Sequence, residues 1–213
     1  MARINFLLQK DFIKIQKKYP NLKLSKFGKN NRIEGLIPLF DDNEVYWGDF
    51  QIEIIIDESY PLTFPMVTET GGRIPKEADR HIYSNGSCCL TVKPIQNIEA
   101  NQGIDLKRYF DVYLVPYLFN QIFFEGHDRF ANEEYLHNTR GILQYFIELL
   151  KVRNIETCLF LMINFVRNES DLCICGSNLN WLDCHKDEVN TLRSIGKDTV
   201  QKYILEILFL LRS

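Results

Sequence analysis

The sequence predicts an α+β fold, and three segments carry that prediction. Residues Ile4 to Tyr19 place apolar side chains on one side of a helical wheel, with lysines between them. Residues Tyr46 to Asp57 begin with alternating apolar and polar positions, as a half-buried strand does. Residues Asp105 to Phe124 are strongly apolar with a helical pattern. Because helices and strands form separate runs along the chain, an α+β domain is expected rather than an alternating α/β one.

Turn and breaker residues delimit the other elements of the N-terminal part. Arg32 to Leu39 and Met66 to Thr70 are predicted as short strands, the second ending before two glycines. With Tyr46 to Asp57 they form an antiparallel meander. The stretch from Gly71 to Gly103 is rich in Pro, Gly and Asn, so it is predicted to be a loop. Long irregular stretches inside compact domains tend to be functional.

Helices are predicted for the rest of the chain. Pro116 should kink or split the helix at Asp105 to Phe124, since proline lacks an amide hydrogen. Further helical segments are expected at Glu133 to Val152, Asn154 to Val166 and Thr199 to Leu211.

Composition and charge restrict the class of partner. The chain has 213 residues, with 25 Lys and Arg against 28 Asp and Glu, a net charge of −3. This near-neutral balance favours neither direct nucleic-acid binding nor an anionic membrane surface. We see no signal-peptide core and no apolar run of the ~20 residues that span a bilayer. The protein is therefore expected to be cytoplasmic, where thiols stay reduced.

Five of the six cysteines are paired or clustered and Cys158 is alone, which in a reducing compartment indicates chemistry or metal binding rather than disulfides. Cys89 follows an Asn-Gly turn in the run Asn85 to Leu90, with His81 eight residues upstream. A thiolate is both a nucleophile and a leaving group, so a cysteine on an accessible loop can receive an acyl group and pass it on. The alternative from spacing alone is that Cys88 and Cys89 both face the core and are inert.

This segment resembles the ubiquitin-conjugating enzymes over roughly residues 1–150. The matching order is a helix, a strand meander, and then Tyr60-Pro61, Pro65, His81, Gly86 and Cys89-Leu90. It is most similar to bacterial relatives of the family, some of which belong to anti-phage and ubiquitin-like conjugation operons. The resemblance implies that Cys89 is the thioester acceptor and that Cys88 takes the apolar position before it.

The resemblance also implies the reaction and the partners. An activating enzyme would load the C-terminus of a ubiquitin-like modifier, or of another protein, onto Cys89, and an amine of a target protein would then attack the thioester. The family's His-Pro-Asn triplet is replaced here by His81-Ile82-Tyr83. The group that stabilises the oxyanion is therefore unassigned, and His81 either transfers protons or braces the loop.

A second cluster lies near the C-terminus and predicts a metal site. Cys173, Cys175, Cys184 and His185 offer three thiolates and one imidazole, the ligand set of tetrahedral Zn²⁺. Their spacing and the Cys-Gly-Ser triplet resemble the SEC-C motif. Four protein ligands leave no open coordination position, so a structural zinc ion is expected. Unbound, half-buried thiols are the alternative.

The predicted organisation is a ubiquitin-conjugating-like domain at residues 1–152, followed at residues 153–213 by a small helical appendage with the zinc motif. Cys158 lies among apolar residues and is expected to belong to the core. Two other functions stay open. One is a catalytically silent ubiquitin-conjugating-like module that acts as a protein-interaction adaptor, and the other is an unrelated zinc-dependent interaction module.

Overall fold

The computed structural model describes residues 5–131, 134–165, 171–173 and 175–212. The chain forms two compact units. The first comprises Met1–Thr91 and Glu99–Glu134, and the second comprises Val92–Ile98 and Tyr135–Ser213. The fold class is α+β, as the sequence predicts, with a four-stranded antiparallel sheet.

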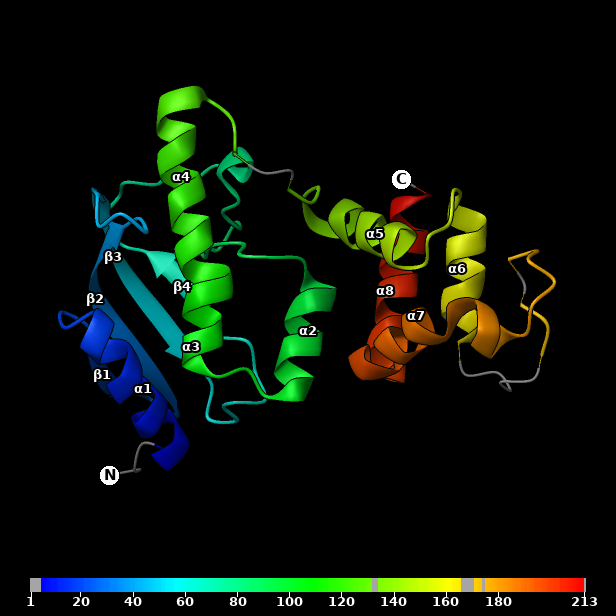
Figure 1. The fold of residues 1–213 in the computed structure, drawn as a ribbon, viewed down its shortest axis with the longest axis horizontal. Helices are drawn as coiled ribbons and strands as arrows, with labels where there is room; N and C mark the ends of the chain where they lie inside the picture. Colours follow the sequence, from blue (N-terminus) through cyan, green and yellow to red (C-terminus); the bar gives the residue numbers. More distant parts are fainter. Residues whose placement is uncertain (1–4, 132–133, 166–170, 174, 213) are drawn as a thin grey trace. The chain divides into compact units, whose positions relative to one another are not determined.

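The first unit starts with a helix followed by the sheet (Figure 1). These elements are α1 (Phe6–Lys18), β1 (Lys23–Phe27), β2 (Asn30–Phe40), β3 (Tyr46–Ile56) and β4 (Met66–Glu69). The strands lie in the sheet in chain order, and every neighbouring pair is antiparallel. The predicted helix and the three predicted strands are confirmed, whereas β1 was not predicted. Its sequence, Lys-Leu-Ser-Lys-Phe, is too short and polar to give a strand signal by itself.

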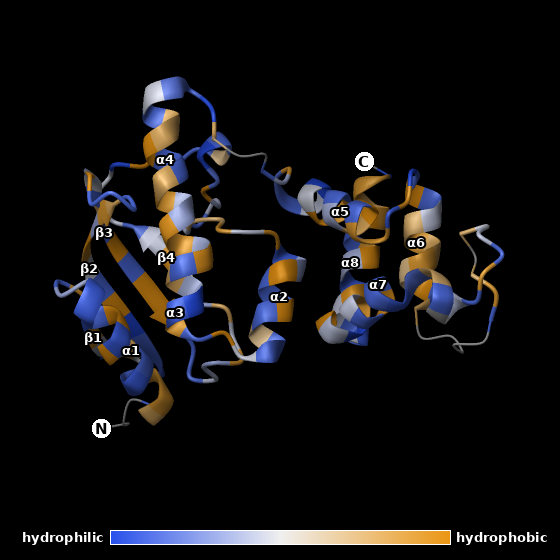
Figure 2. Cartoon of the chain, in the orientation of Figure 1, coloured by the Kyte–Doolittle hydropathy of each residue, from blue (hydrophilic) through white to orange (hydrophobic). Residues whose placement is uncertain are grey.

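One face of the sheet is buried, and β3 shows this most clearly. Phe50, Ile52, Ile54 and Ile56 are all buried, while the residues between them are intermediate or exposed. Alternate side chains of a strand point to opposite faces, so these four share the core face. Figure 2 shows the hydrophobic and polar stretches along this strand.

A long helix covers this unit and contains the predicted irregularity at proline. It runs through α3 (Leu106–Arg108), a π-helical segment η2 (Tyr109–Leu114) and α4 (Val115–His127). The π-helical segment ends just before Pro116, whose ring and missing N–H disrupt regular α-helical bonding. The helix therefore continues through the proline rather than splitting there.

The Tyr60-Pro61 pair of the sequence motif has a structural role. The Tyr60 hydroxyl donates a hydrogen bond to the buried carboxylate of Asp11 on α1, at 2.9 Å. The same hydroxyl accepts one from the backbone N–H of Leu106 at the start of α3, at 3.0 Å. One buried side chain thus connects α1 with the long helix.

The second unit is helical. Its main elements are α5 (Asn138–Leu149), α6 (Ile155–Asn164), α7 (Trp181–Ile195) and α8 (Lys197–Leu210). Helix α8 packs against α5, α6 and α7, and the shared core includes Phe146, Leu161 and Leu192. Cys158 is fully buried in this core, which confirms its predicted role.

Two expectations differ from the structure. The stretch Gly71 to Gly103 is not a loop throughout, because α2 (Lys93–Gln102) occupies its last third. Pro94 at the start of this helix breaks no hydrogen bond, since the first-turn amides have no helical partner. The units also divide near residue 134 rather than at the predicted boundary of 152, since α5 packs against α6 and α8.

Among the helices in the described parts of the chain, none combines the length and the hydrophobicity needed to cross a membrane.

Candidate functional site

A short hairpin brings His81 opposite Cys89. Ile82 and Cys88 form an antiparallel bridge, and the backbone N–H of Cys89 donates to the carbonyl of His81 at 2.7 Å. The chain reverses at Asn85-Gly86, where Gly86 has φ of +84°. Glycine adopts this left-handed region without a Cβ clash. The predicted Asn-Gly turn thus reverses the chain so that the two candidate catalytic residues lie opposite each other.

Helix α4 holds the segment before this hairpin. The Arg80 guanidinium donates to the side-chain oxygen of Gln121 at 2.8 Å, and the Gln121 amide donates back to the Arg80 carbonyl at 3.1 Å. The Tyr117 hydroxyl also donates to the Arg80 carbonyl, at 3.1 Å. Arg80 and Gln121 are both buried. These bonds fix the backbone that enters His81.

The side chains of Cys89, His81 and Glu134 form a connected chain of polar groups. The His81 imidazole is hydrogen-bonded to the Cys89 side chain, and its Nε2 atom lies 2.5 Å from Glu134 Oε2. The other carboxylate oxygen of Glu134 accepts a hydrogen bond from the Asn120 amide at 3.1 Å. The Phe130 ring packs edge-on against the imidazole at 5.3 Å between centroids. The imidazole is therefore held on several sides.

This arrangement changes the protonation of His81. Burial by itself lowers the pKa of His81, but the hydrogen bonds and charges of Cys89 and Glu134 outweigh burial and raise it to about 9. At neutral pH the imidazole is thus mainly protonated, and it presents a positive charge to the Cys89 sulfur.

The two adjacent cysteines have different environments. Cys89 is partly exposed, whereas Cys88 is only 6% exposed. Burial raises the pKa of the Cys88 thiol to about 11, so it is neutral at physiological pH. The structure therefore separates one accessible sulfur beside a cation from one inert, core-facing sulfur.

Tyr83 is the third side chain at the Cys89 sulfur. Its hydroxyl oxygen lies 3.1 Å from the Cys89 Sγ atom. The backbone amides of Cys88 and Cys89 donate to the carbonyls of Val67 and His81, so both are already engaged. In this contact the Cys89 thiol donates to the Tyr83 hydroxyl oxygen, so the hydroxyl lies beside the position that an acyl group on Cys89 would occupy.

Sequence reasoning paired His81 with Cys89 but missed Glu134 and had no role for Tyr83. Glu134 follows α4 and reaches the hairpin only through the fold. One acidic residue among many carries no signal that separates it from a solvated surface charge. Tyr83 was visible as the residue that replaces the family's asparagine, two positions after the histidine.

The second predicted cluster also comes together. The ligand atoms of Cys173, Cys175, Cys184 and His185 all lie within 4.8 Å of one another, and the group could hold a metal ion. The Cys173 Sγ atom lies 3.2 Å from His185 Nδ1, and the Sγ atoms of Cys175 and Cys184 are 3.4 Å apart. Tetrahedral zinc, with bonds of about 2.0–2.3 Å, needs ligand atoms roughly 3.5–3.8 Å apart, which is close to these distances.

The local backbone explains how the ligands converge. Leu172 and Asn180 form an antiparallel bridge, and the Cys173 N–H donates to the Leu179 carbonyl at 2.7 Å. Helix α7 then begins at Trp181 and carries Cys184 and His185 in its first turns. The helix is kinked at His185, with φ of −129° and ψ of 34°. The kink lets these two consecutive residues face the same point, which a regular helix does not allow.

The His185 ring is oriented by a backbone contact. Its Nε2 atom lies 3.1 Å from the carbonyl oxygen of Leu150, which can only accept a hydrogen bond. The proton therefore resides on Nε2, and Nδ1 points its lone pair toward Cys173. Metal-bound histidines have this arrangement, in which the second ring nitrogen donates to a carbonyl or carboxylate.

Trp181 packs beside the cluster and is buried, with its ring centroid 6.1 Å from that of His185. Leu179, just before Trp181, is half exposed. Within the cluster, burial raises the pKa of Cys173. Burial also acts to raise that of Cys175, but hydrogen bonds with Ser177 and the other thiols lower it overall.

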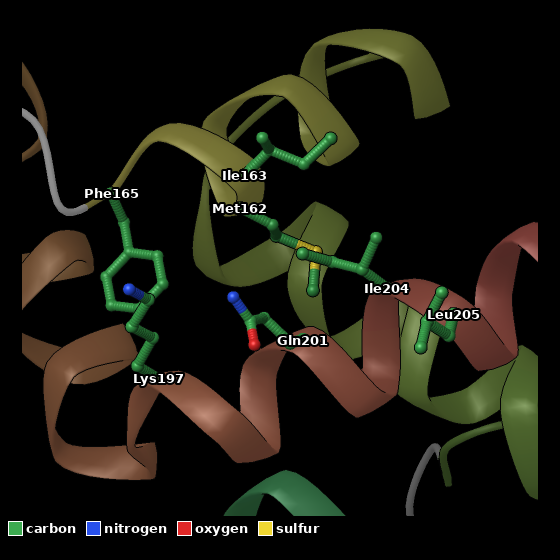
Figure 3. Close-up of a pocket in the computed structure, with 7 residues that line it drawn as sticks. All are labelled: Met162, Ile163, Phe165, Lys197, Gln201, Ile204 and Leu205. Atoms are coloured by element: carbon green, nitrogen blue, oxygen red, sulfur yellow. The ribbon is translucent and has the colours of Figure 1, made fainter.

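The second unit also contains a pocket of about 290 Å³ between α6 and α8 (Figure 3). It is formed by Met162, Ile163, Phe165, Lys197, Gln201, Ile204 and Leu205. These residues include no cysteine, histidine or carboxylate. The pocket thus offers apolar surface with one cation, and none of the nucleophilic or metal-binding groups of the two clusters.

Comparison of the chain with protein-family models, with curated proteins and with solved structures finds no match.

Proposed function

We propose that Cys89 is the nucleophile of an acyl-transfer enzyme that accepts the C-terminus of a ubiquitin-like modifier as a thioester. The observation that carries the proposal is the placement of a partly exposed Cys89 beside the His81 imidazole, which also pairs with Glu134. The resemblance to ubiquitin-conjugating enzymes also supports the proposal. It rests on the motif from Tyr60-Pro61 to Cys89-Leu90 and on the order of helix, meander, loop and helices.

The proposed loading step exchanges one thioester for another. The Cys89 thiolate attacks the carbonyl carbon of a thioester carried by an activating enzyme, the new C–S bond forms, and the old one breaks with departure of a thiolate. His81 stabilises the Cys89 thiolate before the attack.

The proposed transfer step then moves the acyl group to nitrogen. An amine of a target protein attacks the Cys89 thioester, the C–S bond breaks, and the attacking nitrogen loses a proton to solvent. His81 stabilises the departing thiolate, and the Tyr83 hydroxyl donates to the oxyanion of the tetrahedral intermediate.

A chemically prepared ubiquitin thioester tests this proposal without an activating enzyme. Ubiquitin with a C-terminal mercaptoethanesulfonate thioester is mixed with the protein, and the adduct is followed by intact mass with and without a reducing agent. We expect an adduct that the reducing agent removes. It should be lost in Cys89→Ser and kept in Cys88→Ser, the matched control. Addition of free lysine should then discharge the adduct as an amide.

The other outcomes are also informative. An adduct in Cys89→Ser that a thiol reducing agent still removes would show that a different thiol reacts, and the proposal would fail. If ubiquitin binds without any covalent adduct, the catalytically silent adaptor becomes the better description.

We further propose that the cluster of Cys173, Cys175, Cys184 and His185 binds a structural Zn²⁺ ion. The donor set, the ligand-atom spacing and the orientation of His185 support this assignment. Four protein ligands fill the tetrahedral shell, so the ion would link the segment at Cys173–Cys175 to the start of α7 rather than act on a substrate.

A further inference from the structure

Exchange between thioesters can use the His81 imidazole as a charge beside Cys89, but it needs no proton donor there. In that exchange the leaving group is a thiolate, which departs without taking a proton. An amine that leaves an amide bond, in contrast, must be protonated as the C–N bond breaks, because an amide anion is far too basic to depart. A group that can give a proton to the leaving nitrogen, beside the nucleophilic sulfur, is therefore what cleavage of an amide requires.

The geometry around His81 matches this requirement. His81 interacts with both the nucleophile and Glu134, and its Nε2 atom is the one that meets the carboxylate. Glu134 is itself held by Asn120 through its second oxygen. This order of nucleophile, histidine and orienting carboxylate or amide recurs in enzymes that cleave acyl bonds by covalent catalysis.

We propose that the Cys89–His81–Glu134 cluster also hydrolyses acyl bonds, releasing a carboxylic acid and an amine or alcohol. The inference rests on the nucleophilic role of Cys89 in the proposed function, and it adds water as a second acceptor. Glu134 is a positioning residue in this reaction, since it acts through His81.

The reaction balances in two steps. First, the Cys89 thiolate attacks the carbonyl carbon, a C–S bond forms, and the C–N or C–O bond breaks as His81 gives its proton to the leaving atom. Second, water attacks the thioester while the now neutral His81 takes one of its protons. The C–S bond breaks, the thiolate is restored, and His81 is again protonated. The net change is the addition of one water molecule across the acyl bond.

The small ester p-nitrophenyl acetate tests hydrolysis independently of any protein modifier. The p-nitrophenolate anion departs without taking a proton, so this ester reports the acylation of Cys89 as a burst and the hydrolysis of the acyl-enzyme, with neutral His81 as base, as continued release afterwards. We expect a burst of about one equivalent followed by turnover. The Cys89→Ala variant defines the background from the other thiols and should give neither phase above it.

Variants of His81 and Glu134 test whether these two residues take part in hydrolysis. His81→Ala should slow turnover by about 10²–10⁴-fold, the usual contribution of a general acid–base. Glu134→Gln, which retains size and a polar side chain, should slow it by at least about tenfold. Glu125→Gln is the matched control, because it removes a carboxylate paired with Arg73 elsewhere in the same unit, and its rate should equal that of the wild type.

A pH profile separates positioning from a merely structural effect. If turnover needs neutral His81 as base, its rate rises with pH. The inflection of this pH–rate profile should move to lower pH in Glu134→Gln, because the carboxylate that stabilises the proton on His81 is gone. A loss of folded protein would lower the amplitude without moving the inflection.

The outcomes distinguish the two proposals. A burst without turnover in the wild type, or turnover unchanged in both His81→Ala and Glu134→Gln, overturns hydrolysis and leaves thioester loading standing. Turnover of the ester without any adduct from the ubiquitin thioester supports hydrolysis and removes the conjugating function.

Discussion

The Nε2 atom of His81 lies 2.5 Å from Oε2 of Glu134. This ion pair joins the hairpin that carries Cys89 to the segment that follows α4. Because the pair is partly buried, its charges are only weakly screened by water. The contact therefore influences both the stability of the first unit and the protonation of its candidate nucleophile.

Replacement of Glu134 by Gln should lower the pKa of His81 from about 9 toward the ordinary value of about 6.5. The reason is the loss of one of the two groups, Cys89 and Glu134, whose charges raise it. Titration of the His81 ring protons by NMR measures the shift, with Glu125→Gln as the control. An unchanged titration in Glu134→Gln would contradict the role of the ion pair.

The same ion pair predicts how stability depends on pH. The pKa of His81 is higher in the folded than in the unfolded state, so folding binds the proton more tightly. Its contribution to the free energy of unfolding is complete below about pH 6.5 and is lost as the pH rises through about 9. Urea unfolding of the wild type and of Glu134→Gln across this pH range tests this dependence. The difference between their free energies of unfolding should shrink as the pH increases.

Substitution of Tyr83 by Phe should slow acyl transfer without preventing the loading of Cys89. The change removes only the hydroxyl that lies 3.1 Å from the sulfur, and loss of one oxyanion donor typically costs about 10²–10³-fold in rate. Discharge of the ubiquitin thioester onto free lysine measures the effect. Equal discharge rates for wild type and Tyr83→Phe would exclude the hydroxyl as the oxyanion donor.

The metal cluster predicts about one zinc ion per chain in the purified protein, measured by elemental analysis. Cys175→Ser should lose the ion and destabilise the second unit, because structural zinc contributes on the order of 10 kcal/mol in small zinc peptides. Cys89→Ser, in the other unit, should keep the ion. Zinc content that is the same in Cys175→Ser and the wild type would rule out this site.

Two helical glycines offer a paired test of packing. A Cβ at Gly141 would collide with the carbonyl oxygen of Leu136, whereas one at Gly126 would meet no atom within 4 Å. Gly141→Ala should therefore destabilise the second unit by about 1–3 kcal/mol. Gly126→Ala should stabilise the first unit by up to about 1 kcal/mol, since alanine is the better helix former. Denaturant unfolding measures both, and equal effects of the two changes would contradict the packing at Gly141.

Much of the fold follows from local patterns in the sequence. The alternation of Phe50, Ile52, Ile54 and Ile56 predicts β3, and helical periodicity predicts α1 and the long helix around Pro116. The two candidate sites were also visible, since Cys89 follows a turn and the three C-terminal cysteines are clustered. Such signals are readable because they depend on residues that are near one another in the chain.

Only the tertiary structure decided which groups surround the Cys89 sulfur. It buried Cys88, left Cys89 partly exposed, placed the Tyr83 hydroxyl beside the Cys89 sulfur and brought Glu134 to the His81 imidazole. It also assigned α5 to the second unit, through packing against α8. These relations arise from contacts between segments distant in sequence, and a single carboxylate or apolar helix face does not specify its partner until the chain is folded.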